Sequence, residues 1–390
     1  MESGILLIPE SDQKLKQRVA AAWLSRNVKC CIHSEVQLSA MKIDFIPVGT
    51  CVVLESPMYC YIPYCRVFQP QIKNMHLFLL SILYLPLKAT GTKEVIFGHN
   101  NFTEYQVGNM NLILSVPHGG SMEPRDIPDR EAGCWDANTS SCIFSHECPP
   151  GTIQNYKKCK VSTNQDRFTI EVAQALAEEI NKITNAFFPH IIINHLQRFK
   201  MDANREKEEA SFGIPQAEQA WEDYMGFLTT AKSQMTGGLI LDIHGQAHPE
   251  KWIELGYTLS KTSLNSGVFS TSYSSISHLA SQLVNVSSET LVTGNRSLGK
   301  YIEEQNNSYV CVPSPSNPSP QNGSYYSGGY ITKTFGSRSS GTIDAIQLEL
   351  PQWVRAVEER PRFCKALARA VMKFWHTNYC SQYNHEFLPC

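Results

Sequence analysis

Two histidines each follow an apolar run and precede a glycine. His118 occurs in Ser-Val-Pro-His-Gly-Gly and His244 in Leu-Asp-Ile-His-Gly. Ligands of open α/β sheets bind beyond the carboxyl ends of the strands, so two strand-terminal histidines indicate one shared crevice. Imidazole nitrogen is a common zinc ligand, and a hydrolytic zinc site uses three protein ligands and leaves one position for water. Either histidine alone is more often an ordinary core or loop residue, but the pair favours a zinc site.

The third ligand of such a site should be a carboxylate or another histidine. Asp166, at the start of a predicted helix, and Glu123, five residues beyond His118, are both candidates. Asp166 is equally typical of a helix N-cap and Glu123 of a solvated loop, so the residues leave the choice open. His248 forms a His-x-x-x-His pair with His244 but lacks the glutamate of the helical zinc motif, which makes it a weak candidate.

Charged residues near the predicted strand ends can supply the other parts of a hydrolytic site. Asp242 shares the strand face of His244, where it would orient that ligand. Arg198 and Arg205 follow another predicted strand, and arginines can bind a carboxylate in a fork or stabilise an oxyanion. A charged surface loop is the alternative. Glu349 lies inside an apolar run, where it is either a general base beside a metal or a solvent-facing glutamate on an edge strand.

The elements that must position these residues show two periodicities. Short apolar runs predict strands buried on both faces, and apolar stripes at helical spacing predict amphipathic helices between them. This alternation favours an α/β fold with a mixed, mainly parallel twisted sheet and helices on both faces. The predicted strands are 112–116, 191–193, 239–243 and 345–350, and the helical stripes lie within 173–180, 217–228 and 363–374.

Two segments interrupt this alternation of predicted strands and helices. Residues 121–165 are rich in cysteine, proline, serine and aspartate, and we expect a disulfide-pinned insertion there. Residues 311–329 are rich in proline, serine and glycine, and we expect a loop there rather than the interior of a strand or helix. A loop of this length in a compact domain is usually functional or mobile.

An uncharged apolar run at 75–87 follows Lys73 and leads into small residues, which is the layout of a signal peptide at 75–91. The run is too short for a stable membrane span. Residues 1–74 are then an upstream extension of unknown status, and 92–390 form a single catalytic domain. A buried helix or strand, or a short membrane anchor, is the alternative for the apolar run.

The chain downstream of this run has the features of a secreted, extracellular glycoprotein. It contains eight cysteines, and an even number fits disulfide pairing in an oxidising compartment. The formal net charge is −2 and no basic run occurs, which argues against a nucleic-acid partner. The downstream Asn-x-Ser/Thr sequons lie at Asn101, Asn138, Asn285, Asn295, Asn306 and Asn322.

Five short motifs in order resemble the N-formylglutamate amidohydrolase family, a branch of the zinc-carboxypeptidase-like hydrolases, over residues 110–355. The motifs are Val-Pro-His-Gly-Gly at 116–120, Met-Asp-Ala-Asn-Arg at 201–205, Leu-Asp-Ile-His-Gly at 241–245, Tyr-Ser-Gly-Gly-Tyr-Ile at 326–331 and Ile-Gln-Leu-Glu at 346–349. The resemblance implies the phosphorylase/hydrolase-like fold of the zinc carboxypeptidases, with one zinc ion per chain.

The resemblance also implies a role for each matching residue. His118 and His244 would bind zinc, and the family favours Asp166 as the third ligand. Carboxypeptidases place a glutamate three residues after the first histidine, where this chain has Ser121, so the sequence departs from that pattern. Arg198 would polarise the scissile carbonyl, and Glu349 would be the general base. The implied substrate-binding residues are Asn204 and Arg205 for a carboxylate, and Gly328, Gly329 and Tyr330 for the pocket wall.

The function that the resemblance implies is hydrolysis of an amide bond in a small-molecule or peptide substrate that bears a free carboxylate, such as an N-acyl (formyl) amino acid. One alternative is a secreted carboxypeptidase that acts on peptide C-termini. Another is a non-catalytic secreted binding or matrix protein that keeps the fold. The intact set of candidate site residues favours an enzyme over the binding protein.

Overall fold

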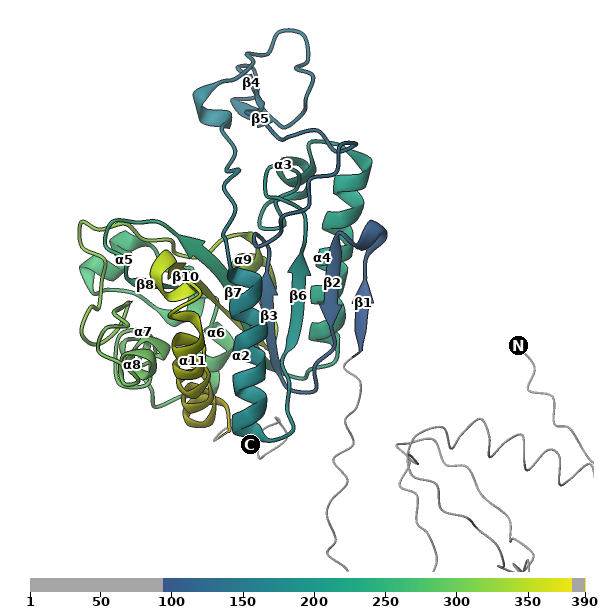
Figure 1. Ribbon diagram of the computed structural model, residues 1–390. Coiled ribbons are helices and arrows are strands. Elements are labelled where there is room, and N and C mark those ends of the chain that lie inside the picture. Colours follow the sequence, from purple (N-terminus) through teal and green to yellow (C-terminus); the bar gives the residue numbers. More distant parts are fainter. Residues whose placement is uncertain (1–93, 381–389) are drawn as a thin grey trace, which may run out of the picture. The chain divides into compact units, whose positions relative to one another are not determined.

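The computed structural model describes residues 94–380 and 390 (Figure 1). The predicted extension at 1–74 and signal peptide at 75–91 lie outside these residues. A mixed eight-stranded sheet runs through the described part of the chain. In spatial order its strands are β1 (Val95–Phe97), β2 (Thr103–Gln106), β6 (His190–Asn194), β3 (Leu112–Val116), β7 (Gly238–Gln246), β10 (Ile343–Pro351), β8 (Ile253–Gly256) and β9 (Cys311–Val312).

The four central strands β6, β3, β7 and β10 run parallel to one another. Strands β1 and β2 extend the sheet antiparallel on one side, and β8 pairs antiparallel with β10 on the other. A parallel sheet is covered on both faces, so its strands read as continuous apolar runs, and all residues of β3, β6 and β10 are buried. The predicted α/β fold with a mainly parallel mixed sheet is confirmed.

Helices cover both faces of the sheet (Figure 1). One face packs against α2 (Thr169–Thr184) and α11 (Arg360–Trp375) through alternate strand residues such as Leu239, Leu241 and Ile243. The opposite face packs against α4 (Pro215–Ser233) and α9 (Tyr330–Phe335). The shorter helices are α3 (Lys207–Ser211), α5 (Lys261–Ser266), α6 (Ser277–Gln282), α7 (Ser288–Val292), α8 (Leu298–Glu303) and α10 (Gln352–Arg355).

The period of two along a strand determines which face carries the candidate site. Ile240 belongs to the core beneath α4, so Asp242 and His244 point to that face as well. On β10, Ala345 belongs to the same core, which places Gln347 and Glu349 beside them. Polar residues therefore gather at the carboxyl ends of β7 and β10 on one face.

The cysteine-rich insertion forms a small lobe beyond the carboxyl ends of the central strands (Figure 1). It contains the hairpin β4 (Cys134–Asp136) and β5 (Ser141–Ile143). Two disulfides, Cys134–Cys148 and Cys142–Cys159, pin the lobe as predicted. A third joins Cys380 to Cys390, whereas Cys311 and Cys364 are buried free thiols, so the pairing of the downstream cysteines is incomplete.

The proline-, serine- and glycine-rich segment 311–329 begins with a short edge strand. Cys311 and Val312 form β9, which pairs with β8 at the edge of the sheet. An edge strand is hydrogen-bonded on one side only, so it tolerates Pro313 directly after it. Within residues 94–380, no helix is long and apolar enough to cross a membrane.

A buried carboxylate lies near the amino end of β10. Asp344 is fully buried and accepts hydrogen bonds from Ser337 Oγ at 2.6 Å and Tyr379 OH at 2.9 Å. Burial raises the pKa of Asp344 from 3.8 to about 7, although these hydrogen bonds oppose the shift. The folded state thus favours the neutral carboxyl. Its stabilising contribution is complete below pH 3.8 and is lost as the pH rises through about 7.

We expect Asp344→Asn to remove this pH dependence because the amide does not titrate. Relative to the variant, the wild type should lose up to about 4 kcal/mol of unfolding free energy as the pH rises from about 4 to about 7. Chemical denaturation of both proteins across this range measures the difference. Parallel stability curves for the two proteins would show that Asp344 is ionised throughout.

Candidate metal centre

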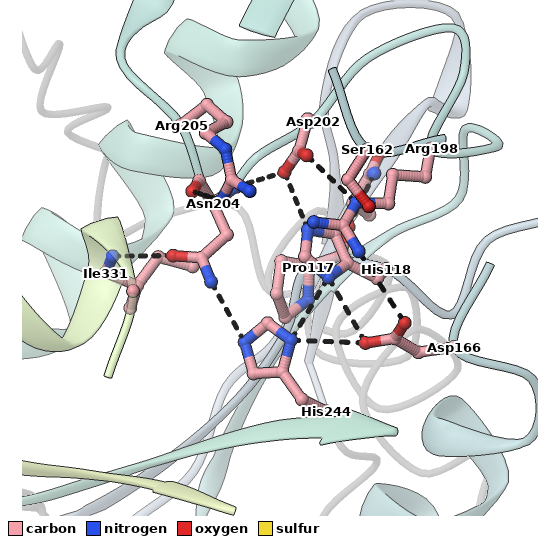
Figure 2. Close-up of polar contacts among 12 residues, drawn as sticks. Pro117, His118, Ser162, Asp166, Arg198, Asp202, Asn204, Arg205, His244 and Ile331 are labelled. Atoms are coloured by element: carbon pink, nitrogen blue, oxygen red, sulfur yellow. Dashed lines mark hydrogen bonds and ion pairs between the residues drawn. The ribbon is translucent and has the colours of Figure 1, made fainter. Parts of the chain in front are cut away.

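Three buried side chains converge where β3 and β7 end and α2 begins (Figure 2). His118 follows β3, His244 lies in β7, and Asp166 precedes α2. The Nδ1 atoms of the two histidines are 3.0 Å apart. Each Nδ1 lies 3.2 Å from the same oxygen, Oδ2 of Asp166. Among the described residues, these three form the group with the spacing of a metal site.

The far nitrogen of each imidazole faces a different carboxylate. His118 Nε2 lies 2.6 Å from Oδ1 of Asp202, and His244 Nε2 lies 3.0 Å from Oδ2 of Asp242. An ionised carboxylate only accepts hydrogen bonds, so it places the imidazole proton on Nε2 and leaves the Nδ1 lone pair free. This pattern is the usual support of a metal-binding histidine.

The three inner atoms therefore face one another as electron-pair donors. Ligands at about 2.0–2.1 Å from a tetrahedral zinc ion are separated by about 3.3 Å, and the separations here are 3.0, 3.2 and 3.2 Å. Two imidazole nitrogens and one carboxylate oxygen are also a ligand set that zinc accepts. The site fits zinc in both chemistry and spacing.

The local electrostatics call for positive charge at this point. Burial lowers the pKa of His244, but Asp242 and Asp166 outweigh it and raise the pKa well above the ordinary value. Burial raises the pKa of Asp166, and the two histidines more than reverse this, so that carboxyl remains ionised. Charge alone does not distinguish a bound metal ion from a proton at the centre of the site. The converging lone pairs favour a metal ion.

The structure places Asp166, and not Glu123, beside the two histidines. Glu123 is exposed and its Oε1 accepts a long hydrogen bond, 3.4 Å, from Gln197 Nε2. His248 also lies outside the cluster, since its Nδ1 contacts Glu254 Oε1 at 2.6 Å.

Asp202 is a site residue to which the sequence analysis gave no role. It is fully buried, faces His118, and accepts a hydrogen bond from Arg198 Nε at 2.9 Å. Arg130 Nη2 lies 3.5 Å from it. Arg130, which the sequence analysis also missed, donates to the carbonyls of Arg198, Glu209 and Ser162. It thereby ties the start and end of the cysteine-rich lobe to the carboxylate behind His118.

Asp242 lies where its strand position predicted. Its Oδ2 faces His244, and its Oδ1 accepts a hydrogen bond from Ser115 Oγ at 2.8 Å. The Ser115 hydroxyl is itself 2.8 Å from the hydroxyl of Tyr224 on α4. These contacts hold the Asp242 carboxylate in place, and that carboxylate in turn orients the His244 imidazole.

Glu349 is buried on a central strand, so its reading as a solvent-facing residue on an edge strand is wrong. It pairs in register with His244 on β7 and with Glu254 on β8. Gln347 Nε2 donates to its Oε1 at 2.9 Å. Burial raises its pKa to about 8. Burial thus makes its carboxylate a stronger base than that of an ordinary glutamate, which suits a general base beside a metal site.

The two predicted carboxylate-binding residues differ in exposure. Asn204 is buried, accepts a hydrogen bond from the Ile331 N–H at 2.9 Å, and lies 3.2 Å from His244 Nε2 through its Nδ2. Its side-chain oxygen is therefore engaged within the protein. Arg205 has 32% of its side chain exposed, although it donates to Glu209 and to the Asn204 carbonyl.

The predicted pocket wall begins α9 next to Asn204. A Cβ added to Gly329 would lie 2.3 Å from Asn204 Nδ2, so a larger residue there would require the Asn204 side chain to shift. Gly328 has φ of +123°, which also favours glycine. The Gly329 N–H donates to Gln347 Oε1 at 2.7 Å, which links this wall to β10 and Glu349. Tyr330 is partly buried, and its ring lies 6.2 Å from that of Trp221.

Replacing Asp166 by asparagine should lower zinc affinity by more than the ~10–100-fold that loss of an outer hydrogen-bond partner costs. Glu123→Gln is the matched control and should bind zinc like the wild type. Competition with a chromophoric chelator measures both affinities. Loss of zinc from the Glu123 variant, with full binding by the Asp166 variant, would reverse the assignment.

No family model matches the sequence, and no curated protein matches it significantly. The solved structures that resemble the fold include the following three. A gene product of Agrobacterium tumefaciens is 11% identical, with 72% of this chain and 95% of that chain covered and a TM-score of 0.38. An N-formylglutamate amidohydrolase of Ralstonia eutropha JMP134 is 9% identical, with 74% and 98% covered and a TM-score of 0.36. The CwlD amidase of Clostridioides difficile, solved with the GerS lipoprotein, is 10% identical, with 69% and 100% covered and a TM-score of 0.28. At these values the functional argument depends on the site itself.

Proposed function

We propose that this protein is a zinc-dependent hydrolase that cleaves an amide bond in an N-acyl amino-acid-like substrate with a free carboxylate. The observation that carries the proposal is the triangle of donor atoms from His118, Asp166 and His244, with the buried Glu349 on the adjacent strand. This is the arrangement that metal-assisted hydrolysis requires: a metal held on three ligands and a basic group beside it.

Each group then has a distinct task. A zinc ion bound here would act as a Lewis acid. It would polarise a carbonyl and lower the pKa of water to about 7. Glu349 takes the proton from the attacking water and passes it to the leaving amine. Arg198, whose Nη1 is 3.8 Å from Asp166 Oδ1, stabilises the negative charge that develops on the carbonyl oxygen.

Recognition of the substrate carboxylate is assigned to Arg205, with Asn204 as its neighbour. Arg205 is the more exposed of the two, and a guanidinium binds a carboxylate through two parallel hydrogen bonds. Asn204 supports this side of the site by holding the start of α9, where Gly328, Gly329 and Tyr330 form the proposed pocket wall.

We further propose that residues 92–390 are the catalytic domain of a secreted glycoprotein. The three disulfides of the described residues are typical of an oxidising compartment. All six sequon asparagines are exposed, as attachment of a bulky glycan requires. Loss of apparent mass on treatment of secreted protein with a glycan-releasing amidase tests this assignment.

A secreted carboxypeptidase that acts on peptide C-termini is the second candidate, because it would use the same metal, base and arginine. A panel of N-acyl amino acids and short peptides separates the two activities. A non-catalytic binding protein is the third candidate, and sub-stoichiometric zinc in carefully prepared protein would favour it.

Glu349→Gln should lower kcat by at least ~10²-fold, because it removes the general base and leaves the ligands in place. Hydrolysis of N-acyl amino acids by zinc-loaded protein measures the effect. Glu358→Gln, an exposed carboxylate after the same strand, is the control and should keep full activity. Near-normal turnover by a zinc-loaded Glu349 variant would exclude this residue as the base.

Substrates with a free carboxylate should be hydrolysed at least about ten times more efficiently than their carboxamides, since a charged hydrogen bond contributes about 1.5–3 kcal/mol. Arg205→Gln should abolish this preference, whereas Arg338→Gln, exposed before the opposite end of β10, should retain it. The ratio of kcat/KM for each substrate pair is the measurement. Equal rates in the wild type would argue against the carboxylate clamp.

A further inference from the structure

A buried arginine lies just beyond the carboxyl end of β10. Arg355 is the last residue of α10, which follows β10 directly, and it is 5% exposed. Its guanidinium donates to three backbone carbonyls. Nε donates to Leu350 at 3.1 Å, Nη2 to Gln246 at 3.4 Å, and Nη1 to Arg167. The proposed reaction gives this buried charge no task.

Two of the three carbonyls belong to the strands that carry site residues. Leu350 directly follows Glu349, the proposed base, on β10. Gln246 lies at the end of β7, shortly after the metal ligand His244. Because Glu349 and His244 are paired in register, the two carbonyls lie on adjacent strands. Arg355 thereby holds both strands just beyond the base and the ligand.

The third carbonyl belongs to a segment 188 residues away along the chain. Arg167 directly follows Asp166, just before α2. Asp166 is also tied to β7 through its own side chain, since the Gly245 N–H donates to its Oδ2 at 3.1 Å. Two contacts therefore hold this ligand, one at its carboxylate and one, from Arg355, at the next carbonyl.

The guanidinium packs closely against β7. A Cβ added to Gly245 would lie 2.5 Å from Arg355 Cζ, so the glycine leaves the space that the flat group occupies. Burial lowers the pKa of Arg355, and the negative charges of Asp166 and Glu349 oppose this shift. An arginine stays protonated in a protein, so its positive charge acts permanently on these two carboxylates. Packing and charge both place Arg355 next to the candidate site.

We propose that Arg355 is a positioning residue that sets the geometry of the metal centre and of the general base by holding three chain segments together. The inference rests on the proposed function, which supplies the roles of Asp166, His244 and Glu349. An arginine suits this task because its planar guanidinium presents five N–H donors in fixed directions. A displacement of about 1 Å at a reacting group can reduce the rate ~10²-fold, so a side chain outside the reacting atoms can control turnover.

The first test compares Arg355→Gln with Arg296→Gln. Arg296 is a matched control, because it is partly buried and donates to Asn378 Oδ1 at 3.0 Å and to the Thr377 carbonyl, in a segment that carries no site residue. Arg355→Gln should lower zinc affinity ~10–100-fold, as loss of an outer partner of a metal ligand does, whereas Arg296→Gln should not. Chelator competition measures affinity, and chemical denaturation measures the stability of each variant. Equal zinc loss in both variants, or unchanged affinity in Arg355→Gln, overturns the proposal.

Activity at saturating zinc separates positioning from loss of metal. Arg355→Gln should lower kcat for N-acyl amino acids up to ~10²-fold. KM should change little, because Arg205, the proposed carboxylate-binding residue, follows β6 and lies outside the three held segments. The visible absorption of the cobalt-loaded protein, which depends on ligand geometry, should change in the same variant. A normal kcat, or a cobalt spectrum like that of the wild type, contradicts the positioning role.

Arg355→Lys separates geometry from charge, and it also serves if the glutamine variant does not fold. Lysine keeps the positive charge but cannot direct a planar fork of donors at three carbonyls, so zinc affinity should stay at least ~10-fold below that of the wild type. Full recovery by lysine would show that charge alone is sufficient and would overturn the proposal. The wild type tests the proposed function independently. Absence of zinc binding or of amide hydrolysis in the wild type overturns that function and the positioning role with it, whereas an active wild type with unaffected Arg355 variants overturns the positioning role alone.

Discussion

Three buried atoms with lone pairs face one another at 3.0–3.2 Å, and much of the surrounding structure serves to keep them there. Such an arrangement is repulsive unless a cation lies between the atoms. Asp202 and Asp242 enforce it from behind by accepting hydrogen bonds from the Nε2–H groups of the two histidines. Arg130 and Arg198 then balance the charge of Asp202. The arginines therefore hold Asp202 in place, and the two carboxylates hold the imidazoles in place.

The parallel sheet explains how distant residues reach this centre. The carboxyl ends of β3, β7 and β10 lie side by side, and the two-residue period places alternate side chains on one face. His244, Glu349 and Glu254 consequently form a row across three adjacent strands. The opposite face of the same strands carries mainly apolar residues packed on α2 and α11, together with the buried carboxylate of Asp344 near the amino end of β10. The site is thus made from one face of the sheet, and the stability of the sheet depends largely on the other.

The sequence was most informative where apolar periodicity dominates. The run 112–116 coincides with β3, and the helical stripe at 363–374 lies within α11. His118 and His244 were found because they end such runs. Asp202 and Arg355 were not assigned, since their roles come from partners that the fold supplies: His118 lies 84 residues from Asp202, and Arg167 lies 188 from Arg355. A pattern within one strand cannot report which carboxylate faces which imidazole.

Arg130 gives the cysteine-rich lobe a modular character. Its guanidinium contacts Ser162, near the end of the lobe, and Asp202, behind the metal ligands. The start and the end of the lobe, which are its two stems, therefore meet at the Arg130 side chain. Between these stems the disulfides close the lobe on itself, and Phe144 and His146 touch the rest of the protein at Phe212. The segment between the stems is consequently a cassette. Its length and surface can diverge during evolution, or be exchanged by an engineer, while the chemistry below stays unaltered.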